Sequence, residues 1–510
     1  MSTTRSKVVF KDYNNKQNLL LPPSFEEMIP STHPVRVVAQ IVDSIDIQPI
    51  IDKYPGGGAS SYYPRMLLKV LIYGYLCNYY SSREIEQAIK SNIHFMWLSG
   101  MSFPDHNTIN RFRGERLKDV LKNVFTQVVD LLIEAGLVDL KEVYLDGTKI
   151  EANANRYTFV WANTIKTNKA KISRQLEELW SYTEQVAKEE LEDTTPTTFH
   201  EVDAEKVKKT ISKIDDALQG KKVDKKVKEK LKRVKRNWPK TLEKYEEQEK
   251  LLNGRKSCSK TDPDASFMRM KEDHLHNSQL KAAYNVQFST QDQFVLNYTV
   301  HQNASDTTTL KDHVESYKHD LKKVPENIVA DAGYGSEENY DYLDKQEIGA
   351  YIKYGSFDNE KQKSKKDPFQ QDYLYYNETE DCFYCPMGQR MTKKRVEKRE
   401  TATGYQQEYA IYQAENCTGC PLRGLCNKDK ENRKISVNHN LRKYKKITKL
   451  VLLSEQGLTY IHQRAPDVEG TFGNVKENHR FRRFYLRGIE KVEIETGLLA
   501  ISQNIRKISA

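Results

Sequence analysis

Four short apolar stretches, interrupted by one long charged segment, constrain the fold of this 510-residue chain most strongly. The first reads K-E-V-Y-L-D-G-T-K-I and begins at residue 141. Two more, K-A-A-Y-N-V-Q-F-S-T and Q-F-V-L-N-Y-T-V-H, stand on either side of Gln291-Asp292, which indicates a hairpin. A helix beginning near Asp306 separates them from the fourth, N-I-V-A-D-A-G-Y-G. The order strand, strand, strand, helix, strand is typical of an α/β domain.

Two of these stretches carry an acidic residue where the strand is expected to end. Asp146 is followed by Gly147, and Asp331 is also followed closely by a glycine. We expect the first and fourth strands to be neighbours in a mixed sheet, which brings Asp146 and Asp331 within reach of one metal ion. Each acid alone could equally be a turn residue. Asp306 is interpreted as the N-cap of its helix, because aspartate is favoured at that position.

A third acid lies in the stretch Y-I-H-Q-R-A-P-D-V-E-G-T-F-G-N-V-K, which begins at Tyr460. Pro466 suits the first turn of a helix, and Asp467 complements the positive helix end. Glu469 flanks an apolar face. The apolar residues recur at helical spacing: Val468, Phe472 and Val475. The alternative is an amphipathic surface helix with an ordinary salt bridge.

Together these acids suggest phosphoryl-transfer chemistry. Asp146, Asp331 and Glu469 can hold two divalent metal ions, which would activate a nucleophile and stabilise the leaving oxygen at phosphorus. Lys476 and Arg464 would position the flanking phosphate. A ridge of arginines follows the helix and is expected to meet the DNA backbone: Arg480, Arg482, Arg483 and Arg487.

The first 135 residues predict short helices joined by tight turns. Ser81 and Glu84 form a capping box, and a helix starting at His106 is expected to continue to about Ala135. Its first turns display side chains that can read base edges: Asn107, Asn110, Arg111 and Arg113. This arrangement is similar to a helix-turn-helix DNA reader, and the alternative is a plain helical bundle.

Two further segments interrupt the strand pattern. From about Ile165 to Cys258 the chain is rich in Lys and Glu with a narrow apolar stripe, which predicts a helical, coiled-coil-like arm. Later, two Cys-x-x-Cys pairs predict a structural zinc site. Its expected ligands are Cys382, Cys385, Cys417 and Cys420, with Cys426 as an alternative.

Composition limits the cellular setting. The net charge of +10 is modest for this length, but basic runs at 363–366 and 480–487 favour a nucleic-acid partner. No apolar run approaches the ~20 residues of a membrane span, and the N-terminus lacks the apolar core of a signal peptide. We therefore expect a cytoplasmic, nucleoid-associated protein whose seven cysteines form no disulfide framework.

The combined blocks resemble a known family. Y-L-D-G-T-K-I, A-D-A-G-Y-G and V-E-G-T-F-G-N-V-K are similar to the three acidic blocks of DDE insertion-sequence transposases. P-R-M-L-L-K-V-L-I-Y-G-Y-L with S-S-R-E-I-E resembles their InsH-type N-terminal domain. Tyr460, Arg464, Glu469 and Lys476 match the Tyr-Arg-Glu-Lys signature of related transposases. The Tyr-to-Arg and Arg-to-Glu intervals are each one residue longer than usual.

The resemblance implies an RNase H-like catalytic fold and a triad of Asp146, Asp331 and Glu469. It also implies Mg²⁺ dependence, with two divalent ions for which Mn²⁺ can substitute, binding to terminal inverted repeats, and cut-and-paste strand transfer. The partners are then double-stranded DNA, as transposon ends and target, and a second copy of the chain in a homodimeric DNA complex. Two rival interpretations are a domesticated DNA-binding protein without catalysis and a structure-selective nuclease on the same fold.

Four modules are expected on this basis. An N-terminal helical DNA-binding domain spans 1–135. The catalytic domain, an RNase H-like mixed sheet of the α/β class, is assembled from 136–162, 258–357 and 448–510. The charged helical insertion covers 163–257, and the Cys-rich zinc-binding insertion covers 358–447.

Overall fold

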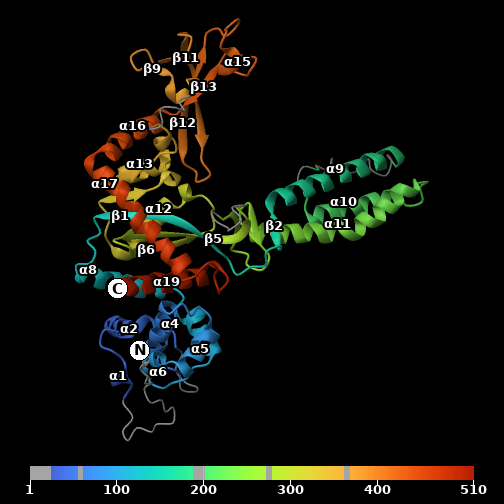
Figure 1. Ribbon diagram of the computed structural model, residues 1–510. Helices are drawn as coiled ribbons and strands as arrows, with labels where there is room; N and C mark the ends of the chain where they lie inside the picture. The colour runs from blue at the N-terminus through green and yellow to red at the C-terminus, as the bar shows by residue number, and fades with distance from the viewer. Residues whose placement is uncertain are drawn as a thin grey trace, which may run out of the picture.

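The computed structural model describes residues 24–54, 61–187, 199, 202–270, 278–360 and 368–509. The basic run at 363–366 lies outside these residues. Figure 1 shows helices from the N-terminal part at the base of the body and a mixed sheet with its helices above them. A second, antiparallel sheet stands at the opposite end, and a helical arm projects to one side. The chain is thus a mixed α/β protein with a helical N-terminal region.

The N-terminal region is helical because its apolar residues recur at helical spacing and its turns are capped. Ser81 and Glu84 form the predicted capping box at the start of α5. The apolar segment P-R-M-L-L-K-V-L-I-Y-G-Y-L forms α4, which is buried along most of its length. The helices are α1 (Phe25–Met28), α2 (Pro34–Ser44), α3 (Gln48–Ile51), α4 (Pro64–Leu76), α5 (Ser82–Ser91), α6 (Ile93–Ser99), α7 (His106–Arg111) and α8 (Leu121–Glu134).

The C-terminal helix joins this region to the sheet. α19 (Ile489–Ile508) contacts α4 and α8 on one side and strand β6 on the other. Its buried residues include Leu498 and Ile501, both fully enclosed. One continuous apolar core therefore runs from the N-terminal helices into the sheet.

The central sheet has the order β4-β5-β1-β7-β8, with β6 also paired to β5. Its strands are β1 (Glu142–Glu151), β4 (Ser266–Arg269), β5 (Leu280–Gln291), β6 (Phe294–His301), β7 (Asn327–Ala330) and β8 (Gly349–Ile352). β1 is antiparallel to β5 and parallel to β7, where Leu145 pairs with Ala330. The prediction that the first and fourth strands are neighbours in a mixed sheet is confirmed.

The hairpin between β5 and β6 lies one residue later than expected. Gln291 pairs with Phe294, so Asp292 and Gln293 form the two-residue loop. Both have positive φ, 49° and 64°, as a tight turn that matches strand twist requires. The remaining helices of the body are α12 (Leu310–Leu321), α13 (Glu337–Lys345), α14 (Phe357–Glu360), α16 (His439–Leu453), α17 (Glu455–Arg464) and α18 (Gly470–Gly473).

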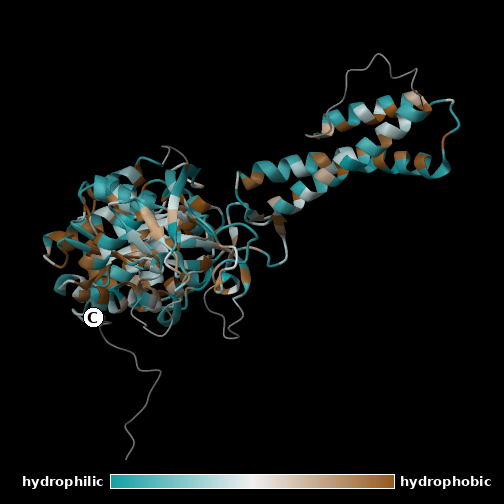
Figure 2. Ribbon diagram, turned by 90° about the horizontal axis from the view of Figure 1, so that it is seen from above, coloured by the Kyte–Doolittle hydropathy of each residue, from teal (hydrophilic) through white to brown (hydrophobic). Residues whose placement is uncertain are grey.

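The charged segment forms a three-helix arm with its own core. A short pair of strands, β2 (Phe159–Trp161) and β3 (Ser257–Ser259), ties its base to the body. Its helices are α9 (Ala162–Val186), α10 (Ala204–Ala217) and α11 (Lys225–Leu252). The apolar stripe of α10, including Val207, Ile211 and Ile214, is buried between the helices. Figure 2 shows the arm extending away from the body.

The second sheet is an antiparallel meander in the order β13-β12-β11-β10-β9. Its elements are β9 (Tyr375–Asn377), β10 (Cys382–Tyr384), β11 (Arg390–Glu400), β12 (Gln406–Ala414), β13 (Lys434–Val437) and the short helix α15 (Arg423–Cys426). Across the part of the chain that the structure describes, none of the helices has the length and apolar character to span a bilayer.

Candidate functional site

Asp146 and Asp331 occupy adjacent positions in the sheet. Leu145 pairs with Ala330 in parallel register, and each is followed directly by one of these acids. Asp146 is only 8% exposed, and its Oδ1 accepts a hydrogen bond from the Gly147 N–H at 2.8 Å. Asp146 lies within β1 rather than at its end, because the strand continues to Glu151. Asp331 follows β7, and its Oδ1 accepts from the Gly333 N–H at 2.8 Å.

Glu469 reaches the same place from a helix more than 300 residues later. The guanidinium of Arg464 donates to Glu469 Oε1 at 2.8 Å and lies 3.2 Å from Asp146 Oδ2. Arg464 is largely shielded, whereas the Glu469 side chain is about half exposed. One cation thus bridges carboxylates of β1 and of the segment after α17. The structure therefore brings Asp146 and Glu469 together around one positive charge.

The helix that carries Glu469 starts earlier than expected. It begins with α17, capped by Ser454, and widens into a π-helical turn at Ala465–Glu469. Pro466 is therefore inside the helical segment and not in its first turn. Because proline has no N–H, it cannot continue the ordinary hydrogen-bond ladder, and the wider turn accommodates it. The predicted buried face is confirmed: Val468, Phe472 and Val475.

Asp467 anchors this helical segment to the sheet. It is 3% exposed and accepts hydrogen bonds from Thr290 Oγ1 at 2.5 Å and from the Gln293 N–H at 3.2 Å. Burial raises the pKa of Asp467 to about 6. The expectation that Asp467 complements the start of a helix is wrong, since the helix begins at Glu455. The contact to the β5–β6 hairpin fixes Glu469, two residues away, relative to the sheet.

Asp306, expected to be a helix N-cap, is a fourth carboxylate near these acids. The side chain does not cap a helix; Oδ1 accepts from Asn285 Nδ2 at 2.7 Å and Gln287 Nε2 at 3.0 Å. A Cβ added at Gly147 would lie 2.6 Å from Asp306 Oδ1, so the carboxylate lies against β1 at Gly147. The available signal was the pair of amides, Asn285 and Gln287, which stand two residues apart and therefore share one face of a buried strand.

The buried phenol of Tyr334 is sensitive to the charges of three of these carboxylates. Its hydroxyl donates to Gln287 Oε1 and is buried. Burial raises the pKa of Tyr334 well above its usual value, and the negative charges of Asp306, Asp146 and Asp331 raise it further. Arg464 acts in the opposite direction. The charges of three carboxylates and one guanidinium thus all act on the Tyr334 phenol.

The other two signature residues occupy different places. Tyr460 is on α17, where its hydroxyl accepts from Gln456 Nε2 at 2.8 Å and its ring packs edge-on against Tyr351 of β8. Lys476 lies in a second π-helical turn, Asn474–Asn478, and is partly exposed. Tyr460 therefore packs the helix onto the sheet.

The N-terminal helix expected to read DNA is divided. α7 ends at Arg111, a π-helical turn follows at Phe112–Arg116, and α8 is a separate helix. Asn107, Asn110 and Arg111 are exposed, as a reader requires.

The expectation that Arg113 reads base edges is wrong, because its side chain is buried. It is 2% exposed and donates to Tyr75 Oη at 3.1 Å and to the Tyr80 carbonyl at 2.7 Å, with Glu495 Oε1 at 3.8 Å. A buried guanidinium held by these groups joins α4 to α19 and has no access to base edges.

The arginine ridge is exposed, but several members already bind protein groups. Arg483 donates to the carbonyls of Ala152 and Ala154, and Arg487 donates to the carbonyl of Asn153. Arg482 pairs with Glu477. Arg480 is exposed at the end of the helical segment, with φ 54°. Two of the four arginines therefore hold the chain that follows β1.

The cysteines form a cluster that differs from the predicted set. One small pocket is lined by Cys385, Cys417, Cys420 and Cys426. The Arg433 guanidinium donates to Cys426 Sγ at 2.8 Å. Cys382 does not line this pocket; it is buried in β10 with its sulfur 3.6 Å from Glu380 Oε2. All seven cysteines are free. Among the described residues, no group of three or more His, Cys, Asp or Glu side chains is gathered closely enough to hold a metal ion.

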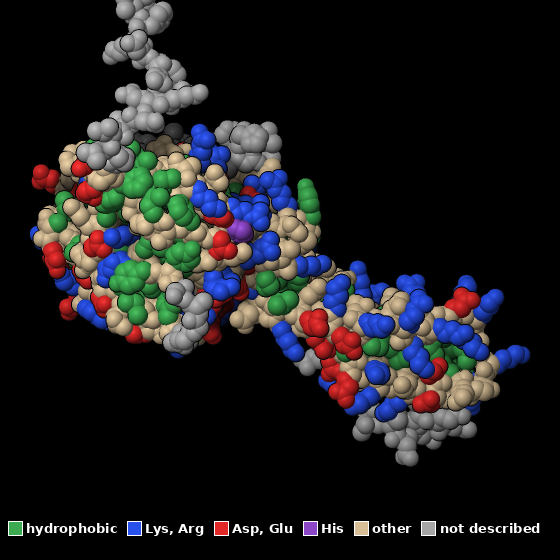
Figure 3. Space-filling model, turned by 90° about the horizontal axis from the view of Figure 1, so that it is seen from below, with side chains coloured by type: hydrophobic (Ala, Val, Ile, Leu, Met, Phe, Trp, Pro, Cys, Tyr) green, Lys and Arg blue, Asp and Glu red, His purple; other side chains and the backbone are tan. Residues whose placement is uncertain are grey.

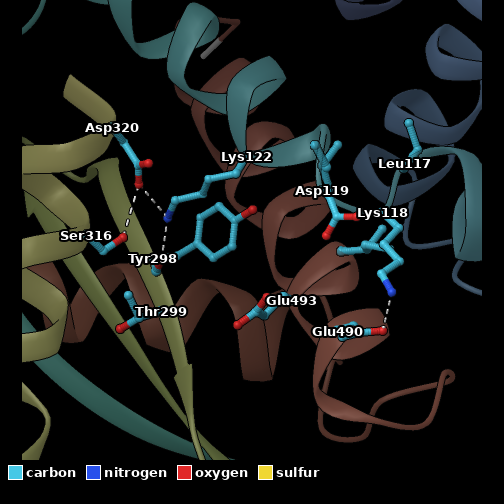
Figure 4. Close-up of a pocket in the computed structure, with 12 residues that line it drawn as sticks. Leu117, Lys118, Asp119, Lys122, Tyr298, Thr299, Ser316, Asp320, Glu490 and Glu493 are labelled. Carbon is cyan, nitrogen blue, oxygen red and sulfur yellow. Dashed lines mark hydrogen bonds and ion pairs between the residues drawn. The ribbon is translucent and has the colours of Figure 1, made fainter. Parts of the chain in front are cut away.

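A cavity of about 240 Å³ lies apart from these acids, where α8 and α19 meet β6 (Figure 4). Lys122 crosses it, donates to Asn297 Oδ1 at 2.7 Å and pairs with Asp320 at 3.4 Å. Burial lowers the pKa of Lys122 to about 8. These contacts tie an N-terminal helix to the sheet.

Comparison with known proteins supports the resemblance described above. Residues 384–509 match the family described as transposase DDE domain, and residues 23–115 match the transposase domain DUF772. The first match includes Glu469 and the four clustered cysteines, and the second ends just after α7. A search of curated proteins found no match. These two matches cover separate parts of the chain, and both support a transposase of the DDE insertion-sequence type.

Proposed function

We propose that this transposase binds the terminal inverted repeats of its element and catalyses DNA strand cleavage and strand transfer with two divalent metal ions. One observation carries the proposal: Arg464 contacts both Asp146 and Glu469, beside the register pair that leads to Asp331. These contacts join Asp146 and Glu469, and the register of β1 and β7 supports adding Asp331 as the third acid of the proposed site. We assign the central sheet, with its helices, as an RNase H-like catalytic core.

The residues present suit magnesium. Asp146, Asp331 and Glu469 offer carboxylate oxygens, the donors that Mg²⁺ prefers, and Mn²⁺ can bind the same set. The guanidinium of Arg464 between two of these acids indicates that the site favours positive charge. When bound, the two ions would lower the pKa of the attacking water or hydroxyl and stabilise the attacking and leaving oxygens of an in-line displacement at phosphorus.

The protein's own side chains position the acids and the DNA. Arg464 sets the spacing of Asp146 and Glu469, and Asp467 fixes the helical segment to the hairpin. Asp306 is held by Asn285 and Gln287 and adds negative charge next to β1. Lys476, with the exposed arginine ridge, would hold phosphates that flank the cut. Water and then a 3′-hydroxyl would act as the successive nucleophiles.

A structural zinc site is part of the proposal, with a revised ligand set. Cys385, Cys417, Cys420 and Cys426 line one pocket and provide the four thiolates that a closed tetrahedral site uses. We leave Cys382 out of this set, because it is buried in β10 and does not line the pocket. Zinc would hold the loop that follows β12, together with α15, against the strands of the second sheet.

The modules then divide the work. We assign 1–135 to DNA binding, 136–162 with 258–357 and 448–510 to catalysis, 163–257 to the helical insertion, and 358–447 to the zinc-binding insertion. Asn107, Asn110 and Arg111 are the proposed base-reading residues, because they are exposed on α7. A homodimer assembled on the paired DNA ends, in the cytoplasm at the nucleoid, completes the proposal.

The test is incubation of the purified protein with duplexes carrying its own flanking DNA ends and Mg²⁺. The proposal predicts cleavage at the ends and joining of the cleaved strands to a target duplex. Cleavage without joining would indicate a structure-selective nuclease. Tight, sequence-specific binding without cleavage would indicate a DNA-binding protein that has lost catalysis.

A further inference from the structure

Positive charge is concentrated at one end of the helical arm. Residues 219–240 contain eleven Lys and Arg against two acidic residues, a surplus of nine in a chain whose net charge is +10. The rest of α11, residues 241–252, contains four Glu and two Lys. The arm is therefore strongly basic in one half and mildly acidic in the other. Helices that need only to be soluble mix both signs along their length.

The basic half is the end of the arm farthest from the body. Ala204, at the start of α10, donates its N–H to Glu246 of α11, whereas Asp215 near the end of α10 pairs with Lys235. The two helices are thus antiparallel, and the turn between them is remote from β3. Figure 1 shows this turn at the free end of the arm. In Figure 3 the arm carries Lys and Arg across the visible face.

The charges stand on a folded platform. Leu231 and Val234 of α11 are buried against the other two helices, and Trp238 packs on the same core. This seam fixes which side chains of the helix face outward. Four basic residues, each four positions apart and all exposed, form one row: Lys228, Lys232, Arg236 and Lys240. We call this set the basic row.

Repulsion between the like charges of the basic row destabilises α11 when no ligand is bound. Like charges at i and i+4 are destabilising by about 0.2–0.5 kcal/mol per pair, and the row contains three such pairs in succession. It extends over about 18 Å at the helical rise of 1.5 Å per residue, which corresponds to about five base pairs of DNA. A polyanion with regularly spaced charges relieves the repulsion and fits this length.

We propose that the free end of the arm binds the phosphate backbone of DNA, away from the cleavage site and without reading sequence. This inference rests on the proposed function for its choice of partner, since the transposase domains act on DNA. α11 is about 42 Å long, so the basic row contacts DNA well outside the segment held by the catalytic sheet. The arm thereby lengthens the bound stretch of DNA and makes the affinity strongly dependent on salt.

The experiment compares two full-length variants with wild type. The first carries Gln at all four positions of the basic row. The matched control carries Gln at four exposed lysines in the near-body half of the same arm: Lys166, Lys171, Lys244 and Lys250. Fluorescence anisotropy measures affinity for end-containing and random duplexes from 50 to 200 mM NaCl, without Mg²⁺. Circular dichroism verifies that helix content is kept.

Each phosphate contact contributes about 0.9 to the slope of log affinity against log salt. With four contacts, the fourfold rise in salt weakens wild type about 150-fold more than the basic-row variant. The loss should be equal for both duplexes, and the control should follow wild type. Equal salt slopes for basic-row variant and control would overturn the proposal. So would a stronger effect on binding to RNA or anionic vesicles than on DNA. Because the experiment measures binding and not cleavage, its result can be interpreted even if the catalytic proposal fails.

Discussion

Replacing Arg113 by methionine separates a DNA-reading role from a structural role. Arg113 is buried and is bonded to Tyr75 and Tyr80, and its charge faces Glu495, which has no exposed surface. Burial raises the pKa of Glu495, and the charge of Arg113 opposes that shift. Removing one partner of a buried ion pair costs about 3–5 kcal/mol. The neighbouring Arg111 is exposed, and Arg111→Met should change stability by less than about 0.5 kcal/mol.

Native-state hydrogen exchange of α4 and α19 measures the local free energy of opening. A loss of 3 kcal/mol corresponds to exchange about 150-fold faster in Arg113→Met, while Arg111→Met should keep wild-type protection. Adding Glu495→Gln to Arg113→Met should recover part of the loss, because no unpaired buried charge remains. Conversely, Arg111→Met should reduce the preference for cognate ends. Normal protection in Arg113→Met, combined with a selective loss of cognate binding, would refute this reasoning.

Three further predictions follow from the structure. Asp306→Asn should slow Mg²⁺-dependent cleavage by ~10-fold or more and leave DNA binding unchanged; an unchanged rate would remove Asp306 from the site. Burial holds the pKa of His313 well below its usual value, so the unfolded state binds more protons as pH falls below about 6.5 and stability decreases there. In His313→Gln, the free energy of urea unfolding should depend less on pH in this range. A pH dependence equal to that of wild type would show that His313 is not the cause. Metal analysis should find about one zinc per chain in Cys382→Ser and much less in Cys426→Ser; the reverse pattern would restore Cys382 as a ligand.

The sequence was sufficient for features determined by local pattern. The strand with Asp146 and the strand before Asp331 were predicted to be neighbours in a mixed sheet, because the order of strands and helix is typical of an α/β domain. The buried face of the helix with Glu469 was predicted from its spacing. The position of Cys426 beside three other cysteines required the path of the chain through β10, β12 and α15.

The errors have identifiable physical reasons. Asp306 was interpreted as a helix cap because caps are local, whereas its partners Asn285 and Gln287 belong to a neighbouring strand. Arg113 was interpreted as exposed from its residue type alone. Its spacing was informative, since it stands four residues after Ile109 and shares that buried face.

The central claim is that Asp146, Asp331 and Glu469 act as one metal-dependent site. The most direct measurement is single-turnover cleavage of an end-containing duplex in Mg²⁺ by Asp146→Asn, Asp331→Asn and Glu469→Gln, with end binding measured in parallel. The amides keep the size of each side chain and remove its charge. The account predicts that each variant binds the ends about as well as wild type and cleaves none of them. Near-native cleavage by any one of the three would contradict it.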